Sequence, residues 1–591
     1  MKEKKSHPGY EFLNSDLVNV SLLVLVVGLI FGMRMSDRPL IGEESRYATA
    51  AREMIASGDW LVFRQQDQVF AERPPLTIWS VVAASLVRGK VDLVSVRLVS
   101  IISIVMTSLL LYCYVKSFAS KFAAMTAGLV YPTMGQVLQI GRLGESEPLF
   151  ALLLSSSLLL WHLGYLKKWP ATLTWSIGFA CAALAALAKG PQAPVYFVSI
   201  IGVYLLVRRD WRYLFSGSTA VGAAVFVAII AAWQIPYYLA TDWESVVATW
   251  TGLVKDRLRT EGLLAHMMKF PLETFGCLLP WSPILLAVIF RETRERLSDF
   301  SSVVTFLVVA LVVSYPTVLL AVGARGRYYL PLYPCIAVLI AIFIDRCSSA
   351  QLGGHARRNW DNFLTGLGVV AGVAAIGCLA IGIIPNSWAE SIHQPRWLLI
   401  LFSIFSLLVA WICFRARKLG TPKFNFAAIL AISSLFGFAC LGLFINTNVA
   451  RWNDPTSAVE QMKSSITNPE KIVSLGPIDH RFAYYYETQI EQIEWPTEQT
   501  PLPQDVEFFV FMRNPVDTPA KRVAGRGRTW YQTPGTVPFA WEELLSIDCN
   551  RVIRPDYEKK VVLGRVIRPL RAVVSDVTKP KAQRPDDSVE Q

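Results

Sequence analysis

Residues 17–33 read LVNVSLLVLVVGLIFGM, an almost uninterrupted apolar run that is long enough to enter a membrane. Similar runs recur along the chain as far as about residue 446. A helix needs about 20 apolar residues to cross a hydrocarbon core about 30 Å thick. Of the 591 residues, 53% are hydrophobic and only 17% are charged, which is too little charge for the surface of a soluble protein of this size. The sequence therefore predicts a polytopic α-helical membrane protein.

About thirteen transmembrane helices are expected. The first follows a short N-terminus, residues 1–16, and no small-residue cleavage site comes after it, so we expect it to remain as an anchor. The expected spans lie near residues 17–36, 93–115, 120–138, 146–165, 170–187, 190–207, 216–238, 270–290, 301–323, 328–345, 363–384, 396–414 and 426–446. Together, residues 17–446 form the predicted membrane domain.

The distribution of Lys and Arg over the short loops predicts the orientation, because cytoplasmic loops carry an excess of both residues. If the N-terminal MKEKK is cytoplasmic, every second loop also falls on that side, and these loops are the basic ones. Their basic residues are Lys116, Lys121, Lys167, Lys168, Arg208, Arg209, Arg212, Arg291, Arg294, Arg296, Arg346, Arg357, Arg358, Arg415, Arg417, Lys418 and Lys423. The net charge of +12 is thus explained mostly by the membrane topology. Basic residues dispersed in this way do not indicate a nucleic-acid-binding surface.

An odd number of spans places the C-terminal part outside the cytoplasm. Residues 447–576 contain strand-like runs at 471–475, 506–512 and 560–567 and a helical pattern at 480–487, so we expect a small α/β extracytoplasmic domain. Its single cysteine, Cys549, cannot form a disulfide within the domain. Residues 577–591 are rich in charge and proline and are expected to be disordered.

The first outer loop, residues 37–77, is unusual because it combines arginines with carboxylates on the side where basic residues are normally few. It contains IGEESRYATAAREMIASGDW (41–60), in which a helix from about Glu43 places Tyr47, Ala50, Ala51 and Met54 on one face. Glu43 and Arg46, three residues apart, can also share a face. This stretch alone suits a membrane-surface helix with an acidic N-terminus and a salt bridge. Arginine also suits bidentate binding of phosphate, so a membrane-level phosphate is the second interpretation.

A second acidic site, GRLGESEP (141–148), is expected at the same side, at the mouth of a span, where its carboxylates could simply be solvated. Two further stretches, AERPPLTIW (71–79) and RGRYYLPLYP (325–334), place arginines and tyrosines at that membrane boundary. A structural turn and interfacial anchoring explain each of them separately. Together, two acidic sites with arginines nearby suit a reaction that needs a base and a phosphate clamp.

These stretches resemble the lipid-linked-sugar glycosyltransferases of the GT-C class, in particular the aminoarabinose transferases that modify lipid A and the protein O-mannosyltransferase-like group. GEESRYATAAREMIASGDW and AERPPLTIW are similar to the pattern D-E-x-R-Y-A-x-x-x-R-E-M, G-D-W and F-E-K-P-P-L-x-Y-W of that family. GRLGESEPL, LAKGP, LPWSP and RGRYYLPLYP follow in the family's order. The resemblance covers roughly residues 20–345.

The resemblance implies a role for eight residues. Glu43 stands at the position of the catalytic base, and Glu147, five residues after Arg142, stands at the second acidic position, so both are candidate catalytic residues. The donor-binding residues that it implies, with the phosphate of the lipid carrier as their ligand, are Arg46, Arg73, Tyr328, Glu72, Lys189 and Arg142. The chain departs from the family where both acidic positions carry Glu in place of Asp and where Arg73 replaces a lysine.

The resemblance implies transfer of a sugar from a polyprenyl-phosphate donor to an extracytoplasmic hydroxyl of a lipid (lipid A), a cell-envelope glycan or a protein. The expected location is the inner membrane, with the C-terminal domain in the periplasm and membrane lipid around the spans. No metal cofactor is required, and a divalent metal is compatible but not indicated. Two alternatives stay open: a transporter or flippase for lipid-linked precursors, and a non-catalytic member of the same fold.

Overall fold

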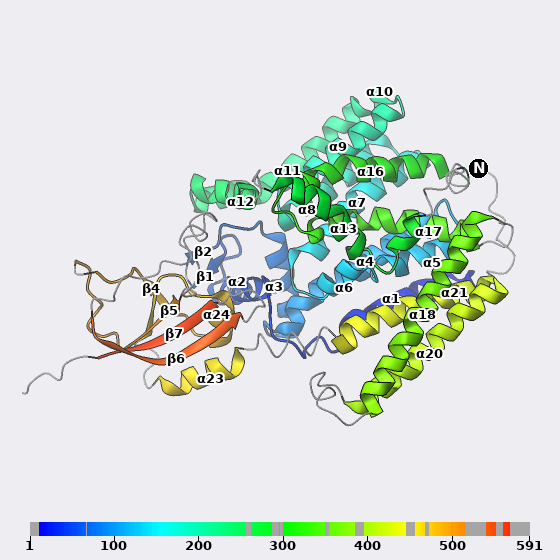
Figure 1. Cartoon of the computed structure of the whole chain (residues 1–591). Helices are drawn as coiled ribbons and strands as arrows, with labels where there is room; N and C mark the ends of the chain where they lie inside the picture. The colour runs from blue at the N-terminus through cyan, green and yellow to red at the C-terminus, as the bar shows by residue number, and fades with distance from the viewer. Residues whose placement is uncertain are drawn as a thin grey trace, which may run out of the picture.

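A computed structural model shows a helical bundle with a small α/β domain at one end (Figure 1). Residues 1–10 and 577–591, which include the expected disordered tail, lie outside the residues that the structure describes. The described residues are 11–66, 68–255, 262–286, 295, 300–348, 354–383, 395–444, 455–466, 472–497, 499–513, 539–550 and 559–567.

Within these described residues, nine helical segments are long and apolar enough to cross a membrane. They comprise α4 (Leu93–Lys116), α7 (Ser146–Lys167), α8 (Ala171–Lys189), α10 (Trp211–Leu214) with α11 (Gly217–Ala240), α16 (Ser301–Leu319), the 3₁₀ helix η4 (Gly326–Leu332) with α17 (Tyr333–Ser348), α18 (His355–Ile383), α20 (Arg396–Leu419) and α21 (Pro422–Gly437) with the π-helix η5 (Phe438–Phe444). Four shorter apolar helices accompany them: α1 (Asp16–Gly32), α3 (Leu76–Arg88), α5 (Lys121–Val130) and α9 (Gln192–Val207).

The polytopic helical architecture is therefore confirmed, although two of the expected spans are interrupted. The span expected near 120–138 ends at Val130 and resumes as α6 (Gly135–Ile140). Pro132 lies in this break, and proline has no backbone N–H with which to continue the helical hydrogen bonds. The span expected near 270–290 is divided into α13 (Leu263–Cys277) and α14 (Ser282–Leu285), with Pro280 between them.

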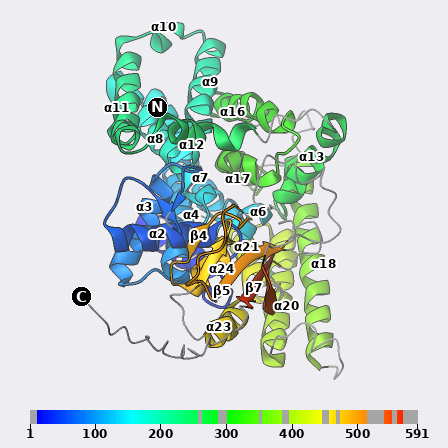
Figure 2. The same ribbon diagram turned by 90° about the vertical axis from the view of Figure 1, so that its left-hand side faces the viewer.

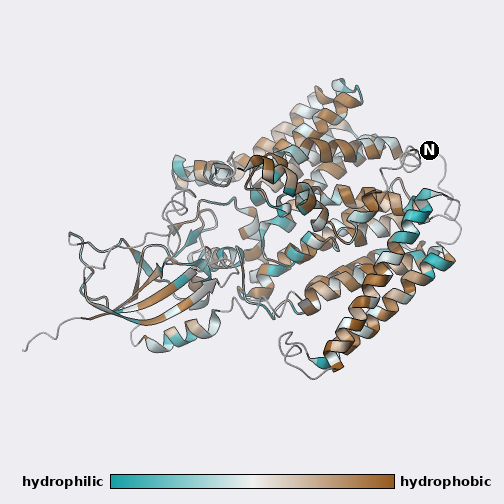
Figure 3. Cartoon of the chain, in the orientation of Figure 1, coloured by the Kyte–Doolittle hydropathy of each residue, from teal (hydrophilic) through white to brown (hydrophobic). Residues whose placement is uncertain are grey.

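Many large apolar side chains point away from the protein, as expected for helices surrounded by lipid. Val373 and Ile376 on α18 and Leu401 and Ile404 on α20 are more than half exposed. Helices such as these are brown over most of their length in Figure 3, and their teal residues gather near the ends. This distribution supports a multi-pass membrane protein, because charged residues are costly inside hydrocarbon.

The C-terminal domain contains a mixed five-stranded sheet of order β4-β3-β5-β7-β6. The strand-like runs of the sequence fold as β3 (Ile472–Leu475), β5 (Phe508–Arg513) and β7 (Lys559–Val566), beside β4 (Glu491–Ile493) and β6 (Trp541–Asn550). β3 pairs in parallel with β4 and β5, and β7 pairs antiparallel with β5 and β6. Two helices, α23 (Thr456–Ser465) and α24 (His480–Tyr486), complete the domain, and Val459, Met462 and Phe482 from them share one apolar core with the sheet.

Helix α24 connects this domain to the segment between α1 and α3. That segment contains α2 (Glu44–Ser57) and a two-stranded hairpin, β1 (Arg64–Gln65) and β2 (Gln68–Val69), and α12 (Trp243–Lys255) lies near it at the same end of the molecule (Figure 1). Turned by 90°, Figure 2 shows α24 and the sheet beside α2 and α3. The segment that carries the first acidic motif and its arginines therefore lies at the end of the bundle next to the C-terminal domain.

Candidate active site

Helix α2 presents the first motif as the sequence predicted. The helix begins immediately after Glu43 and ends at Gly58, whose φ of +72° is readily adopted only by glycine. The expected apolar face is buried: it consists of Tyr47, Ala50, Ala51 and Met54. This packing fixes the rotation of α2 and therefore the direction in which Glu43 and Arg46 point.

The two adjacent glutamates of the motif have different environments. Glu44 is fully buried and its carboxylate accepts hydrogen bonds from Arg97 Nε (2.8 Å) and Nη2 (3.0 Å). It also accepts from the backbone N–H groups of Ile41 (2.8 Å) and Gly144 (2.9 Å). Burial favours the neutral acid, but the charge and hydrogen bonds of Arg97 outweigh it and hold the pKa of Glu44 below its usual value. Ionised Glu44 therefore has a structural role: it holds the start of α2 against α4 and against the loop before α7.

Glu43, in contrast, faces a cluster of charged side chains and keeps 28% of its side chain exposed. Its Oε2 lies 3.4 Å from Arg46 Nη1 and 3.7 Å from Arg73 Nη2. Arg46 also donates to Glu72 Oε2 at 2.9 Å. The structure thus brings together four residues that the resemblance singles out, from both ends of the first loop.

Arg73 lies among several acidic groups, but not every N–H of its guanidinium has a hydrogen-bond partner among the described residues. Its side chain is largely buried, and its Nε has no hydrogen-bond partner among the described residues. Burial alone would lower the pKa of Arg73, but Tyr47, Glu43 and the neighbouring carboxylates raise it, so this arginine stays charged. A buried guanidinium with an unsatisfied N–H is suited to receive an anion such as a phosphate.

The second acidic site lies against the first. Glu147, in the first turn of α7, pairs with Lys189 Nζ at 3.0 Å, at the end of α8. The Lys189 ammonium lies 5.5 Å from the centre of the Tyr328 ring, from η4. Glu147 also acts on the guanidinium of Arg73, the partner of Glu43, and both carboxylates raise the pKa of that arginine, so the two acidic sites share a cation.

Arg142 does not join this group of residues. Its Nη1 donates to the carbonyl of Met33 at 2.8 Å, and its charged neighbours are Arg38, Arg97 and Glu44. Burial and the two other arginines lower the pKa of Arg142 to about 9. Arg142 belongs to the buried network around Glu44. Its position therefore does not favour direct contact with a donor phosphate.

Three residues without a role implied by the resemblance also belong to the site. Arg327 lies between the two acidic residues of GESEP, with Nη1 2.9 Å from Glu145 Oε2 and Nε 3.8 Å from Glu147 Oε1. Tyr47 hydrogen-bonds Ser146 and faces Arg73, and burial raises the pKa of Tyr47 to about 12. Glu145 and Arg327 lie inside the stretches GRLGESEP and RGRYYLPLYP, which the sequence had singled out, but the resemblance gave neither residue a role.

The arrangement offers a base and a group of cations that can bind an anion. Glu43 is accessible and lies beside guanidinium groups that can stabilise a leaving anion. Among the described residues, no three His, Cys, Asp or Glu side chains are grouped so that they could hold a metal ion.

The C-terminal domain contacts the back of α2 through polar bonds. Ser45 Oγ and His480 Nδ1 are 2.7 Å apart, and the Tyr485 hydroxyl accepts from the Leu40 N–H at 2.8 Å. Arg52 Nη1 donates to the carbonyl of Tyr484 at 3.0 Å, and its guanidinium lies 4.6 Å from the centre of the Tyr484 ring. Helix α24 thereby supports the element that carries Glu43.

The Arg52→Ala variant is expected to loosen this contact. The change removes one charge-assisted hydrogen bond and one cation–π contact, together about 1–3 kcal/mol. Limited proteolysis of the intact protein in detergent should then cut between the membrane domain and the C-terminal domain about 5- to 150-fold faster, because cleavage follows the population of the open form. Arg417→Ala, an exposed arginine at the end of α20, is the matched control. Equal cleavage rates in both variants would contradict a supporting role for α24.

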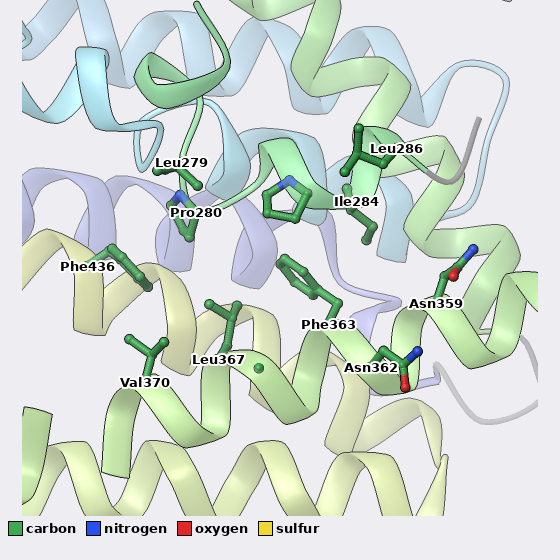
Figure 4. Close-up of a pocket in the computed structure, with 12 residues that line it drawn as sticks. Leu279, Pro280, Ile284, Leu286, Asn359, Asn362, Phe363, Leu367, Val370 and Phe436 are labelled. Atoms are coloured by element: carbon green, nitrogen blue, oxygen red, sulfur yellow. The ribbon is translucent and has the colours of Figure 1, made fainter. Parts of the chain in front are cut away.

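A separate apolar pocket of about 640 Å³ lies between α14, α18 and α21 (Figure 4). Its walls include Pro280, Ile284, Phe363 and Phe436, with Asn359 and Asn362 on its border. Neither acidic motif contributes to it, and it holds no acid or base for a reaction. The charged cluster is therefore the candidate active site.

Comparison with known proteins agrees with the motifs. Residues 72–236 match the family model described as dolichyl-phosphate-mannose-protein mannosyltransferase. The undecaprenyl phosphate-alpha-4-amino-4-deoxy-L-arabinose arabinosyl transferase 2 of Proteus mirabilis is 26% identical over 67% of this chain and 71% of its own length. The corresponding transferase of Pectobacterium carotovorum is 25% identical over 77% of this chain and 81% of its own length.

A solved structure has the same fold. The crystal structure of ArnT from Cupriavidus metallidurans bound to undecaprenyl phosphate is 18% identical in sequence, covers 93% of this chain and 98% of its own, and superposes with a TM-score of 0.66. The expected fold class is thus confirmed, although the number of thirteen spans is not. The chain is a multi-pass membrane protein of GT-C fold that resembles the polyprenyl-phosphate-sugar glycosyltransferases of the aminoarabinose transferase and protein O-mannosyltransferase type, as its motifs indicated.

Proposed function

We propose that this glycosyltransferase moves a sugar from a polyprenyl phosphate to an acceptor hydroxyl by single displacement, with Glu43 as the base. The observation that carries the proposal is the position of Glu43, an accessible carboxylate 3.4 Å from Arg46 and 3.7 Å from Arg73 at one end of an apolar bundle. A lipid carrier would place its chain along the apolar helices and its phosphate at this end.

The reaction balances with the groups present. The oxygen of the acceptor hydroxyl attacks the anomeric carbon of the sugar, and its proton passes to Glu43. The bond between the anomeric carbon and the phosphate oxygen breaks, and its electron pair stays on the phosphate. Arg46 and Arg73 stabilise the charge that develops there, as preorganised cations do in sites shielded from water. Inversion at the anomeric carbon follows from a single displacement.

Lys189, Tyr328 and Glu147 form the other wall of the proposed donor site. Glu147 holds the Lys189 ammonium at 3.0 Å, beside the Tyr328 ring, so the cation is positioned before a donor arrives. Glu72 holds Arg46 in the same manner at 2.9 Å. Such pairing reduces the cost of ordering long side chains when the phosphate binds.

The relatives named as transferases of 4-amino-4-deoxy-L-arabinose from undecaprenyl phosphate support a polyprenyl-phosphate donor for this chain. We place the chain in the inner membrane with residues 1–16 in the cytoplasm and the domain of residues 447–576 in the periplasm. The basic loops support this orientation. Lipid A, a cell-envelope glycan and a protein hydroxyl are the candidate acceptors.

The positions of the charged residues support an enzyme better than a transporter. Transporters place ionisable or helix-breaking sites near the middle of the bilayer. In the described part of this chain, Glu43 and Arg46 pair instead at the start of α2, which lies beside the C-terminal domain (Figure 1), and Glu147 pairs with Lys189 at the end of α8. This placement favours an enzyme that works at the membrane surface.

The direct test supplies the purified protein in detergent with labelled polyprenyl-phosphate sugars and a cell-envelope extract. Transfer of label to lipid A, glycan or protein would identify sugar and acceptor together. Absence of transfer with every donor, while the protein remains folded, would favour the non-catalytic alternative.

A second prediction concerns a single residue of the proposed phosphate site, Arg73. Arg73→Ala removes a charged donor group from the proposed phosphate site and should weaken donor binding about 10- to 100-fold, the usual range for a charge-assisted hydrogen bond. Arg73→Lys restores the residue that the related family carries and should retain most of the affinity. The dissociation constant of the donor, measured by direct binding, reports both effects. An alanine variant that binds donor as tightly as the parent protein would exclude Arg73 from the phosphate site.

A further inference from the structure

Glu145 is a buried carboxyl for which the proposed reaction has no role. It immediately precedes α7, and only 5% of its surface is exposed. Its Oε2 accepts from Arg327 Nη1 at 2.9 Å. Its Oε1 fills the space beside Gly42, where a Cβ would come within 2.7 Å of that oxygen. Gly42 has a φ of +59° and directly precedes Glu43, so Glu145 lies against the backbone of the proposed base.

Arg327 connects Glu145 to the rest of the site. The same guanidinium that bonds Glu145 has its Nε 3.8 Å from Glu147, and this Nε has no hydrogen-bond partner among the described residues. It also lies 5.5 Å from the centre of the Tyr328 ring. Arg327 is therefore directed by Glu145 while part of its donor capacity remains open toward the proposed phosphate site.

The charges of the described cluster show why the state of Glu145 matters. Its cations are Arg46, Arg73, Lys189 and Arg327, and its carboxylates are Glu43, Glu72, Glu145 and Glu147. If all of them are ionised, the cluster is neutral. If Glu145 carries a proton, one positive charge remains, which matches the single negative charge of a phosphodiester that links a sugar to a lipid.

The neighbours of Glu145 favour this protonated form. Burial and the charge of Glu147 raise the pKa of Glu145, while Arg327 opposes them and Glu43 and Glu44 add to them. Arg38, from the segment before α2, is a further charged residue near it. Because the pKa is raised, Glu145 holds its proton at neutral pH and loses it as the pH rises.

We propose that Glu145 is a positioning residue of the donor site, which holds Arg327 beside Glu147 and sets, by its own charge, the net charge that the donor phosphate meets. The proposal rests on the proposed function, because it assumes a polyprenyl-phosphate donor in this cluster. Neutral Glu145 leaves the site attractive for the phosphodiester. Ionised Glu145 cancels that attraction and competes with the phosphate for Arg327.

The test measures the dissociation constant of a polyprenyl-phosphate sugar for the full-length protein in detergent between pH 6.5 and 9.5. The phosphodiester of this probe does not titrate in that range. For the parent protein, we expect the dissociation constant to rise about tenfold at alkaline pH, equivalent to about 1.4 kcal/mol. Glu145→Gln keeps an acceptor for Arg327 without a charge, so its dissociation constant should stay constant. An equal alkaline rise in the Glu145→Gln variant would overturn the proposal.

Two further variants provide a control and an independent test. Glu244→Gln, an exposed carboxylate on α12, should keep the parent's pH dependence. Arg327→Lys keeps the charge but lacks the planar fork of N–H donors that reaches both carboxylates, so it should bind donor several-fold more weakly at neutral pH. Unchanged affinity would contradict the proposal even if Glu145→Gln did not fold. Sugar transfer by the parent protein is measured separately. Transfer with no effect of Glu145→Gln on the pH profile refutes the role of Glu145, whereas pH-dependent donor binding without any transfer refutes the proposed function.

Discussion

Replacement of Glu43 by glutamine is expected to reduce sugar transfer by about 10²- to 10⁴-fold, the usual contribution of a general base. Glutamine has the same shape but cannot take the proton of the acceptor hydroxyl. The loss should appear in the turnover number measured with labelled donor, because the phosphate clamp of Arg46 and Arg73 is retained. The dissociation constant of the donor should change little.

Glu43→Asp tests the length of the side chain. The related family has aspartate at this position, and glutamate places its carboxylate about 1–1.5 Å further from the backbone; a displacement of about 1 Å can cost about 100-fold in rate. If the site of this chain has adjusted to glutamate, the aspartate variant should be slower than the parent but faster than Glu43→Gln. Glu244→Gln on α12 is the matched carboxylate-to-amide control. Full activity of Glu43→Gln would refute the assignment of the base.

Replacement of the next residue, Glu44, should have a different effect, on stability. Glu44→Ala leaves the Arg97 guanidinium buried without its carboxylate, and breaking a buried ion pair in this way costs about 3–5 kcal/mol. The free energy of unfolding, followed by tryptophan fluorescence in mixed micelles, should fall by this amount. The double variant Glu44→Leu/Arg97→Met should recover part of it, because apolar residues of similar volume can replace a buried pair.

The pH dependence of stability distinguishes the ion pair from simple packing. The folded-state pKa of Glu44 is lowered, so its contribution is present above the pKa of the unfolded chain and is lost as the pH falls through the folded value. The parent protein should therefore lose its advantage over Glu44→Ala on acidification. A difference in unfolding free energy that does not change with pH would show that Glu44 acts through packing alone.

The helical membrane architecture could be predicted from the sequence because hydrophobic runs are a local property of the chain. A run of apolar residues of membrane-spanning length needs no tertiary context to be recognised, and α4, α7, α16 and α20 lie close to where the runs were read. The breaks at Pro132 and Pro280 are also local, but the hydropathy of the surrounding residues concealed them. The face of α2 that carries Tyr47 and Met54 followed from helical periodicity in the same way.

By itself, the sequence determined that this is a multi-pass helical protein, that two acidic motifs and several arginines lie at the boundaries of its spans, and that these motifs resemble those of GT-C glycosyltransferases. Only the tertiary structure decided which of two adjacent glutamates faces the site and which holds the fold together. Arg97 and Gly144 reach Glu44 from distant parts of the chain, and their burial removes it from any reaction. Arg142 was assigned to the donor by its place in a motif, yet it lies in that same buried network. Arg327 joins Glu145 and Glu147 across 182 and 180 residues of sequence, a contact that only the packing of η4 against α7 creates.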